Sequence, residues 1–437
     1  MITITSLAVA LIAAKNVAAV GSPFGFATGT TGGNGAAQAV PTSAAQLKSW
    51  LEDNVTRNIL LDRTYDFTDT EGSITGTVCK SWNCSPNPQY TIDTGSGCGS
   101  SPASTATWKK AGTAGINVKS NKTILGKGTS GWIKGKGLRL SGVSNVIIQN
   151  IRISDLNPQY VWGGDALHIE NASKVWVDHN YFKNTGRQFI VTVRNPSKPP
   201  LDQRSLANDH DVQGFGAAKQ VTISNNYFDG QSTYSTGCDQ HHYWALLFAG
   251  NGDQITFALY TTLRKYQGFE SRAIDVFTRR YVYSGRGPHI GGLDGYSLTL
   301  HMYNNYFNEI AGHAIDPDTG SKILVEGNYF NKVFILLYEG DRLSKLRISQ
   351  VKTPATGNTK GAAFAPTSAS MNSQCSGTLG RNCVSNTLAG GSGALTNTGS
   401  TGILSAFTAS VVKSASILDP GQVPSVVTAN AGLGKVN

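Results

Sequence analysis

The chain has 437 residues, of which 15% are charged and 50 are glycine, a composition that disfavours long helices and favours turns. The formal net charge of +10 suits an acidic partner such as a nucleic acid, an anionic lipid surface or an acidic polysaccharide. No dense Lys/Arg run or RNA-binding signature is present, so nucleic acid is the weakest of the three. The length allows two or three ordinary domains, although repetitive β architectures are often longer as one domain.

The first segment, residues 1–19, is similar to a secretory signal peptide. An apolar run over residues 2–14 is followed by small residues, with Lys15 after the run instead of before it. No later segment is long and apolar enough to span a bilayer. We therefore expect a secreted protein with no membrane partner, whose mature part, 20–437, forms one domain.

Six cysteines follow, at Cys79, Cys84, Cys98, Cys238, Cys375 and Cys383. An even number behind a signal peptide favours disulfides, although the sequence alone leaves the pairing open. Cys375 and Cys383 enclose a short loop, "CSGTLGRNC", and are the best candidates for a pair. No histidine stands at ligand spacing beside the cysteines, which argues against a metal site. Sequons that permit N-glycosylation occur at Asn54, Asn83, Asn121 and Asn171.

Four later segments share one pattern: "VWVDHNYF", "VTISNNYF", "LTLHMYNNYF" and "ILVEGNYF". Each is a β-rich run, then asparagine, which tolerates a tight corner, then an aromatic pair. Asn305 and Asn328 are 23 residues apart, the length of one coil of a solenoid. The pattern predicts an all-β, single-stranded right-handed parallel β-helix with long loops on one side. The spacing of 46 residues from Asn180 to Asn226 is interpreted as two coils.

Three stretches interrupt this pattern: 193–213, about 260–279, and 333–350. Excising each one restores the strand alternation. The first and third begin with valine, whose codons start GT, and end with glutamine, which CAG encodes. We hypothesise that the three are retained introns translated in a gene model. The alternative is that they are surface loops, since long insertions cost little stability.

Three charged residues stand beside glycines on successive coils: Asp165 in "VWGGDALHIE", Arg187 in "NTGRQFIVT" and Arg286 in "SGRGPHIGG". Equivalent positions of stacked coils line up, so we expect all three on one face of the solenoid. An acid beside two cations stays ionised, because the cations lower its pKa. The net positive pocket suits a sugar acid or a negative charge that develops in a transition state.

Six motifs in order, "VWGGDAL", "VWVDHNYF", "GRQ", "CDQHHYWAL", "SGRGPHIGG" and "LGRNC", resemble those of fungal pectin lyases in the polysaccharide lyase superfamily. The resemblance runs from about Ser22 to the C-terminus, apart from the three interruptions. It implies endo-type β-elimination on methyl-esterified galacturonan, the polymer of pectin. A base removes the C5 proton, which is acidic because it lies α to the ester carbonyl, and the C4 oxygen leaves.

The resemblance also implies roles for the charged residues. Arg286 matches the arginine nearest C5, proposed as the base, and Arg187 matches the arginine that replaces the calcium ion of pectate lyases. Asp165 matches the aspartate that orients both. Arginine is normally protonated at every working pH, so His289 is the nearest titratable alternative as base or as a substrate-binding group. A solvated turn position is the plainer interpretation of His289.

No cofactor or metal is expected. The methyl ester has already removed the charge that a metal ion would neutralise, and a calcium site would need several carboxylates. Asp178 is present, but Arg187 occupies the position after "NTG". We expect Asp178 to cap a corner of the coil, and His179 to pack within the stack.

Aromatic side chains are expected to bind the esterified polymer through the apolar faces of its sugar rings. Trp162, which is close to Asp165, is the strongest candidate, followed by Tyr243 and Trp244. Trp82 lies in the cysteine-rich loop "CKSWNC", where the family carries further aromatic residues of the cleft, but the loop departs in length. The expected partner is methyl-esterified homogalacturonan, bound by a monomer.

Three other activities are compatible with a solenoid. A calcium-dependent pectate lyase is the nearest, and Arg187 argues against it. A polygalacturonase hydrolyses with paired carboxylates, and its NTD, GHG and RIK signatures are absent from the sequence. A non-catalytic glycan-binding β-helix does not need Asp165, Arg187 and Arg286 together, and it becomes the outcome if the interruptions disable the site.

Overall fold

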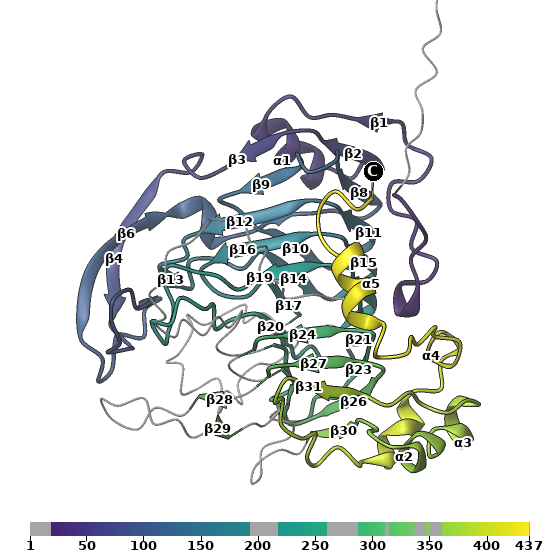
Figure 1. Ribbon diagram of the computed structural model, residues 1–437. Helices are drawn as coiled ribbons and strands as arrows, with labels where there is room; N and C mark the ends of the chain where they lie inside the picture. Colours follow the sequence, from purple (N-terminus) through teal and green to yellow (C-terminus); the bar gives the residue numbers. More distant parts are fainter. Residues whose placement is uncertain are drawn as a thin grey trace, which may run out of the picture.

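The computed structural model describes residues 19–192, 217–259, 287–310, 314–333, 335–336, 347–348 and 361–436. Within them the chain winds into coils whose strands stack one above another along a single axis (Figure 1). None of the helices in these ranges is long and apolar enough to cross a membrane. Arg286 and most of the three interrupting stretches lie outside the described residues.

The largest sheet, sheet 1, has ten strands, and every neighbouring pair is parallel. The strands follow one another across the sheet in chain order, because each coil adds one strand to the stack. They are β1 (Gln38–Ala39), β2 (Arg57–Leu61), β8 (Lys122–Gly126), β11 (Ser144–Gln149), β15 (Ala172–Asp178), β18 (Ala218–Ser224), β21 (Gln254–Ala258), β23 (Leu298–Tyr303), β26 (Ser321–Glu326) and β30 (Ala362–Phe364).

Two further parallel faces complete each coil. Sheet 2 contains β7 (Ile116–Asn117), β10 (Leu138–Ser141), β14 (Leu167–Glu170), β17 (Ile190–Val191), β20 (Leu246–Phe248), β22 (His289–Ile290) and β25 (Asp316–Pro317). Sheet 3 contains β3 (Thr64–Asp66), β9 (Trp132–Lys134), β12 (Arg152–Leu156), β16 (Tyr181–Thr185) and β19 (Tyr227–Asp229), and continues as β24 (Tyr306–Asn308), β27 (Tyr329–Asn331) and β31 (Thr387–Ala389). The predicted parallel β-helix is confirmed.

Buried asparagines form the corners between sheets 1 and 3. The side-chain amide of Asn180 donates to Oδ1 of Asn226 at 3.0 Å, and Asn305 donates to Asn328 at 2.8 Å. Each amide thereby satisfies the next in an interior where an unpaired polar group is costly. Because β15 pairs directly with β18, the 46 residues from Asn180 to Asn226 make one coil. The interpretation of that spacing as two coils was wrong, since the first interruption lengthens a single coil.

The core is filled by equivalent side chains stacked from coil to coil. Phe182 and Phe228 stack with ring centroids 5.1 Å apart, and Phe307 and Phe330 with centroids 4.8 Å apart. At the N-terminal end, helix α1 (Ala44–Glu52) packs buried leucines on the first coils. The short helices α2 (Ala369–Ser373), α3 (Ser376–Leu379), α4 (Ser410–Lys413) and α5 (Val423–Asn430) follow the last coils. A solenoid exposes its core at each end, and α1 covers one of them.

An antiparallel arm projects from the side of the solenoid near its N-terminal end (Figure 1). It is made by β4 (Ser73–Cys79), β5 (Tyr90–Ile92) and β6 (Ala103–Lys109). Strand β13 (Tyr160–Val161) joins β5 in parallel, so the arm is anchored next to the loop that carries Asp165. This places the arm beside the candidate site described below.

All six cysteines are paired, as expected. The predicted Cys375–Cys383 bridge is confirmed, and the other two bridges are Cys79–Cys98 and Cys84–Cys238. The last of these spans 154 residues and ties the arm to the coil that contains sheet 2 strand β20. The four sequon asparagines are all exposed, as glycosylation requires.

The two ends of the first interruption are held by one buried carboxyl group. Asp253 accepts hydrogen bonds from the Thr192 hydroxyl at 2.5 Å, the Ala218 amide at 2.7 Å and the Gly250 amide at 3.0 Å. Thr192 immediately precedes the undescribed segment 193–216, and Ala218 follows it within two residues. The coil is thus closed by described residues, whatever occupies the segment between them.

Asp253 makes stability depend on pH. Burial raises its pKa from 3.8 to about 7, although the three hydrogen bonds act in the opposite direction. A group whose pKa is higher in the folded state contributes stability that is complete below pH 3.8 and is lost as the pH rises through about 7. We expect the free energy of unfolding to fall between pH 4 and 7 more steeply in the wild type than in Asp253→Asn. Denaturant titrations across this range measure the difference, and parallel curves would contradict the assignment.

Candidate active site

Asp165 lies in the loop between β13 and β14, where the chain approaches its neighbours very closely. A Cβ atom on Gly164 would lie 2.1 Å from the carbonyl oxygen of Gly112, so only glycine fits before the acid. Asp165 Oδ1 accepts a hydrogen bond from the backbone N–H of Gln188 at 2.7 Å. The carboxylate is therefore fixed against the next coil, with Oδ2 on the side of Arg187.

Arg187 is held between this carboxylate and an aromatic ring. Its Nη1 is 3.8 Å from Asp165 Oδ2, and its guanidinium lies over the Trp162 ring, 3.9 Å from the centroid. Only 7% of Arg187 is exposed, so the surrounding protein screens its charge little. Trp162 has φ 71°, a left-handed conformation that is costly for a bulky residue. The strain is consistent with a ring held in place by its surroundings to support the arginine.

His242 fixes the backbone of this site and was not singled out from the sequence. Its Nε2 contacts the carbonyl oxygens of Arg187 at 2.7 Å and Trp244 at 2.8 Å, and so carries the proton. Burial lowers the pKa of His242 to about 4, against the opposing effect of these carbonyls, so the ring is neutral at ordinary pH. The sequence did offer one signal for this role, because His242 lies in "CDQHHYWAL", one of the six motifs that carry the family resemblance.

His289 belongs to strand β22 of sheet 2, so the interpretation of this residue as a solvated turn histidine was wrong. It pairs in register with Leu247 and Asp316, and its Nδ1 is 2.7 Å from Asp316 Oδ2. Nε2 is 3.8 Å from Asp318 Oδ2. The hydrogen bond to Asp316 orients the imidazole, and the longer contact to Asp318 places a second carboxylate beside Nε2. Arg286, three residues earlier, lies outside the described residues.

The aromatic candidates have different roles. Trp162 is partly exposed, and its ring contacts Arg187, a partner that was not predicted; its predicted role in binding sugar rings stays a prediction. Trp244 is only 3% exposed, and its Nε1 donates to Gln89 Oε1 at 3.2 Å. It therefore has no free face for a sugar ring, which corrects its expected place in the cleft floor. Tyr243 and Trp82 pack edge-on against Trp244, with centroids 4.9 and 6.5 Å away, and both keep partial exposure.

Asp178 and His179 are structural, as expected. Asp178 is 1% exposed and accepts hydrogen bonds from Gln149, Ser224 and Asn225, and its Oδ2 lies 2.5 Å from Nδ1 of His179. Such a carboxylate has no oxygen left for a metal ion. No group of three or more His, Cys, Asp or Glu side chains that fits a metal occurs among the described residues.

The fold and the site together define a parallel β-helix that presents an acid–arginine pair beside an outward sheet face. The family model described as pectate lyase matches residues 1–241. A probable pectin lyase F-2 of Aspergillus terreus is 41% identical over 95% of this chain and 74% of its own length. Pectin lyase D of Aspergillus niger is 38% identical over 94% of both chains. The chain belongs to the pectate lyase family and is a polysaccharide lyase.

Solved structures agree on the fold. A pectate lyase from a Bacillus species, in complex with trigalacturonate, has a TM-score of 0.55 at 19% identity, covering 94% of this chain and 99% of that one. The major allergen of cedar pollen has a TM-score of 0.51 at 15% identity, covering 94% and 92%. At these identities the likeness concerns the arrangement of the coils.

The stack of Arg187 on Trp162 is directly testable. We expect Trp162→Ala to lower kcat/KM about 30-fold, because a desolvated cation–π contact is worth about 2 kcal/mol and its loss frees the guanidinium. Arg187→Lys keeps the charge but not the planar stack, and should cost at least as much. Initial rates on esterified pectin measure both.

Trp132→Ala is the matched control. Trp132 carries a similar stack with Arg152, 4.7 Å from the ring centroid, on sheet 3. Its loss should reduce stability without reducing turnover by the folded enzyme. Equal activity losses in the two tryptophan variants would show that the Arg187 stack has only a structural role.

Proposed function

We propose that the chain is a secreted, monomeric, endo-acting pectin lyase that cleaves α-1,4-linked methyl-esterified galacturonan by β-elimination, in the degradation of plant cell-wall pectin. The observation that carries the proposal is the buried, ring-supported Arg187 beside Asp165. The names of the Aspergillus relatives, at 41% and 38% identity over most of the chain, support the same substrate class. An irregular signal segment at residues 1–19 and six paired cysteines support secretion.

The reaction needs a cation where negative charge develops. Removal of the C5 proton by the base places charge on the ester carbonyl oxygen. The C4–O bond then breaks as the C4=C5 double bond forms, and the departing oxygen takes up a proton from the base or from solvent, which gives a new reducing end and a 4,5-unsaturated sugar. Arg187 supplies fixed N–H donors in a largely dry environment, where such donors stabilise charge most effectively. Asp165 holds the guanidinium in place and offsets part of its charge, which limits how tightly it binds the neutral ester in the ground state.

The proton acceptor is assigned to Arg286, on the resemblance, with His289 as its neighbour. This assignment requires Arg286 to lose its proton in the substrate complex, which is a large shift for an arginine. His289, oriented by Asp316, lies three residues away and binds substrate or assists the transfer. The two roles predict different consequences of substitution.

We expect Arg286→Lys to lower kcat by a factor of about 10² to 10⁴, the usual contribution of a general base, and His289→Gln to lower it less than about tenfold. Rate against pH should keep its shape in His289→Gln. The opposite order of losses, together with a changed shape of the rate profile in His289→Gln, would transfer the role of base to His289.

The activity itself is measured by the ultraviolet absorbance of unsaturated uronide ends. We expect product from methyl-esterified pectin in the presence of a chelator, because Arg187 occupies the place that the resemblance gives to calcium. Product only from unesterified polymer with added calcium would identify a calcium-dependent pectate lyase instead. Absence of product from folded protein under both conditions would leave a glycan-binding β-helix.

The same assay tests the three interruptions. The full chain is compared with one that lacks 193–213, 260–279 and 333–350. If both proteins are active, the interruptions are loops that the fold tolerates. If only the shortened chain is active, the result supports the hypothesis that the interruptions are translated introns. Transcript sequences that run continuously through all three stretches would exclude the intron hypothesis.

A further inference from the structure

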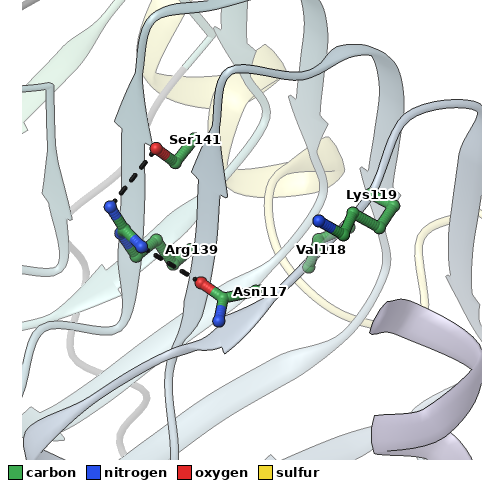
Figure 2. Close-up of a pocket in the computed structure, with 5 residues that line it drawn as sticks. All are labelled: Asn117, Val118, Lys119, Arg139 and Ser141. Carbon is green, nitrogen blue, oxygen red and sulfur yellow. Dashed lines mark hydrogen bonds between the residues drawn. The ribbon is translucent and has the colours of Figure 1, made fainter. Parts of the chain in front are cut away.

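A polar pocket of about 280 Å³ lies at the N-terminal edge of sheet 2, and the proposed chemistry does not use it. Figure 2 shows its lining residues, Asn117, Val118, Lys119, Arg139 and Ser141. Asn117 and Arg139 stand on neighbouring strands, β7 and β10, and the amine of Lys119 is directed toward the space beside them (Figure 2). We call this the edge pocket.

The edge pocket lies on the outward face of sheet 2, and the candidate active site lies in the loops that lead into strands β14 and β17 of the same sheet. Arg139 points away from the core, because Leu138 and Leu140 on either side of it are buried. It pairs in register with His168, three residues after Asp165. Adjacent strands are about 4.8 Å apart, so β7 lies about 10 Å from β14. Arg139 is also three residues, about 10 Å, further along the strand than the level of Asp165. A polymer that runs obliquely over sheet 2 from Asp165 therefore reaches the edge pocket within a few sugar units.

The groups in the edge pocket favour an anion. Arg139 donates from Nη1 to Asn117 Oδ1 and from Nη2 to Ser141 Oγ, both at 3.2 Å, and forms an ion pair with Glu170. Glu170 balances one of the two cations, and no ion pair joins Lys119 to any other described residue. The pocket therefore keeps about one net positive charge, together with a second N–H on Nη1 and the ammonium group of Lys119.

The size and position of the edge pocket limit which anion it takes. A single carboxylate matches one spare ammonium and one spare guanidinium N–H. We propose that the edge pocket binds the free carboxylate of an unesterified galacturonate unit in the same polymer chain, a few units from the bond that is cleaved. This inference rests on the proposed function. Binding of this carboxylate gives the enzyme a preference for polymers that place a neutral ester at the scission point and a charged unit in the edge pocket.

Substitution of Lys119 tests the proposal without disturbing the Arg139–Glu170 ion pair. The measured quantity is the ratio of kcat/KM on partly esterified polymer to kcat/KM on fully esterified polymer. We expect Lys119→Ala to lower this ratio about three- to fivefold, the effect of losing one partly exposed ion pair, and Lys119→Glu to lower it further. Lys127→Ala is the matched control, because Lys127 is an exposed lysine just after β8 of sheet 1, and it should leave the ratio unchanged.

A ratio that is the same in wild type, Lys119→Ala and Lys119→Glu would overturn the proposal. So would equal losses on both polymers, because these would show that Lys119 acts on any galacturonan. The proposed function fails separately, when wild-type protein yields no unsaturated product from either polymer.

A direct binding measurement tests the inference even if the protein has no lyase activity. Unesterified oligogalacturonate is titrated into the full chain with chelator present, and binding is followed by calorimetry. Lys119→Glu should weaken this binding at least about fivefold, whereas a fully methylated oligomer should bind both proteins alike. Unchanged binding of the unesterified oligomer would overturn the proposal independently of any activity.

Discussion

Stacking of equivalent positions from coil to coil is the constraint on which the rest of this structure depends. A single coil is too thin to bury its own inward face, so its apolar side chains are covered only by the coils above and below. The same repetition aligns the polar corners. Asn180 bonds to Asn226, and Asn305 to Asn328, because each corner has the same backbone as its neighbour. Stability and alignment therefore have the same physical origin.

The candidate site is a local departure from this regularity. Gly163, Gly164 and Gly186 allow backbones to approach at distances that a Cβ atom would block. This close approach brings Asp165 and Arg187, on successive coils, to within ion-pair distance. The arginine is then held by the Trp162 ring and by the backbone contact of neutral His242. The surrounding coils are rigid enough to hold a strained tryptophan conformation, and this rigidity is what pre-organises the charge.

Other charged motifs serve the fold. Arg381, in "LGRNC", donates to both carboxylate oxygens of Glu326 at 2.8 and 2.9 Å and to the backbone of the last turns. Burial alone would raise the pKa of Glu326, but hydrogen bonds from Arg381 and His301 hold it at about 2. The buried carboxylate of Asp178 likewise has its donors inside the stack. A charge is stable inside this solenoid only where several neighbours share it.

The sequence by itself determined the coil, because strand alternation, the asparagine corner and the aromatic pair are local signals that recur along the chain, in one case at a distance of one short coil, from Asn305 to Asn328. It also determined the Cys375–Cys383 bridge, since a short loop limits the choice of partner, and the chemical types at Asp165 and Arg187. Other features depend on which coils are neighbours, and only the tertiary structure decided these. The burial of Trp244, the role of His242 and the Cys84–Cys238 bridge belong to this group. A coil lengthened to 46 residues hides the repeat period of the solenoid. Contacts between coils cannot be recognised from the sequence of either segment alone.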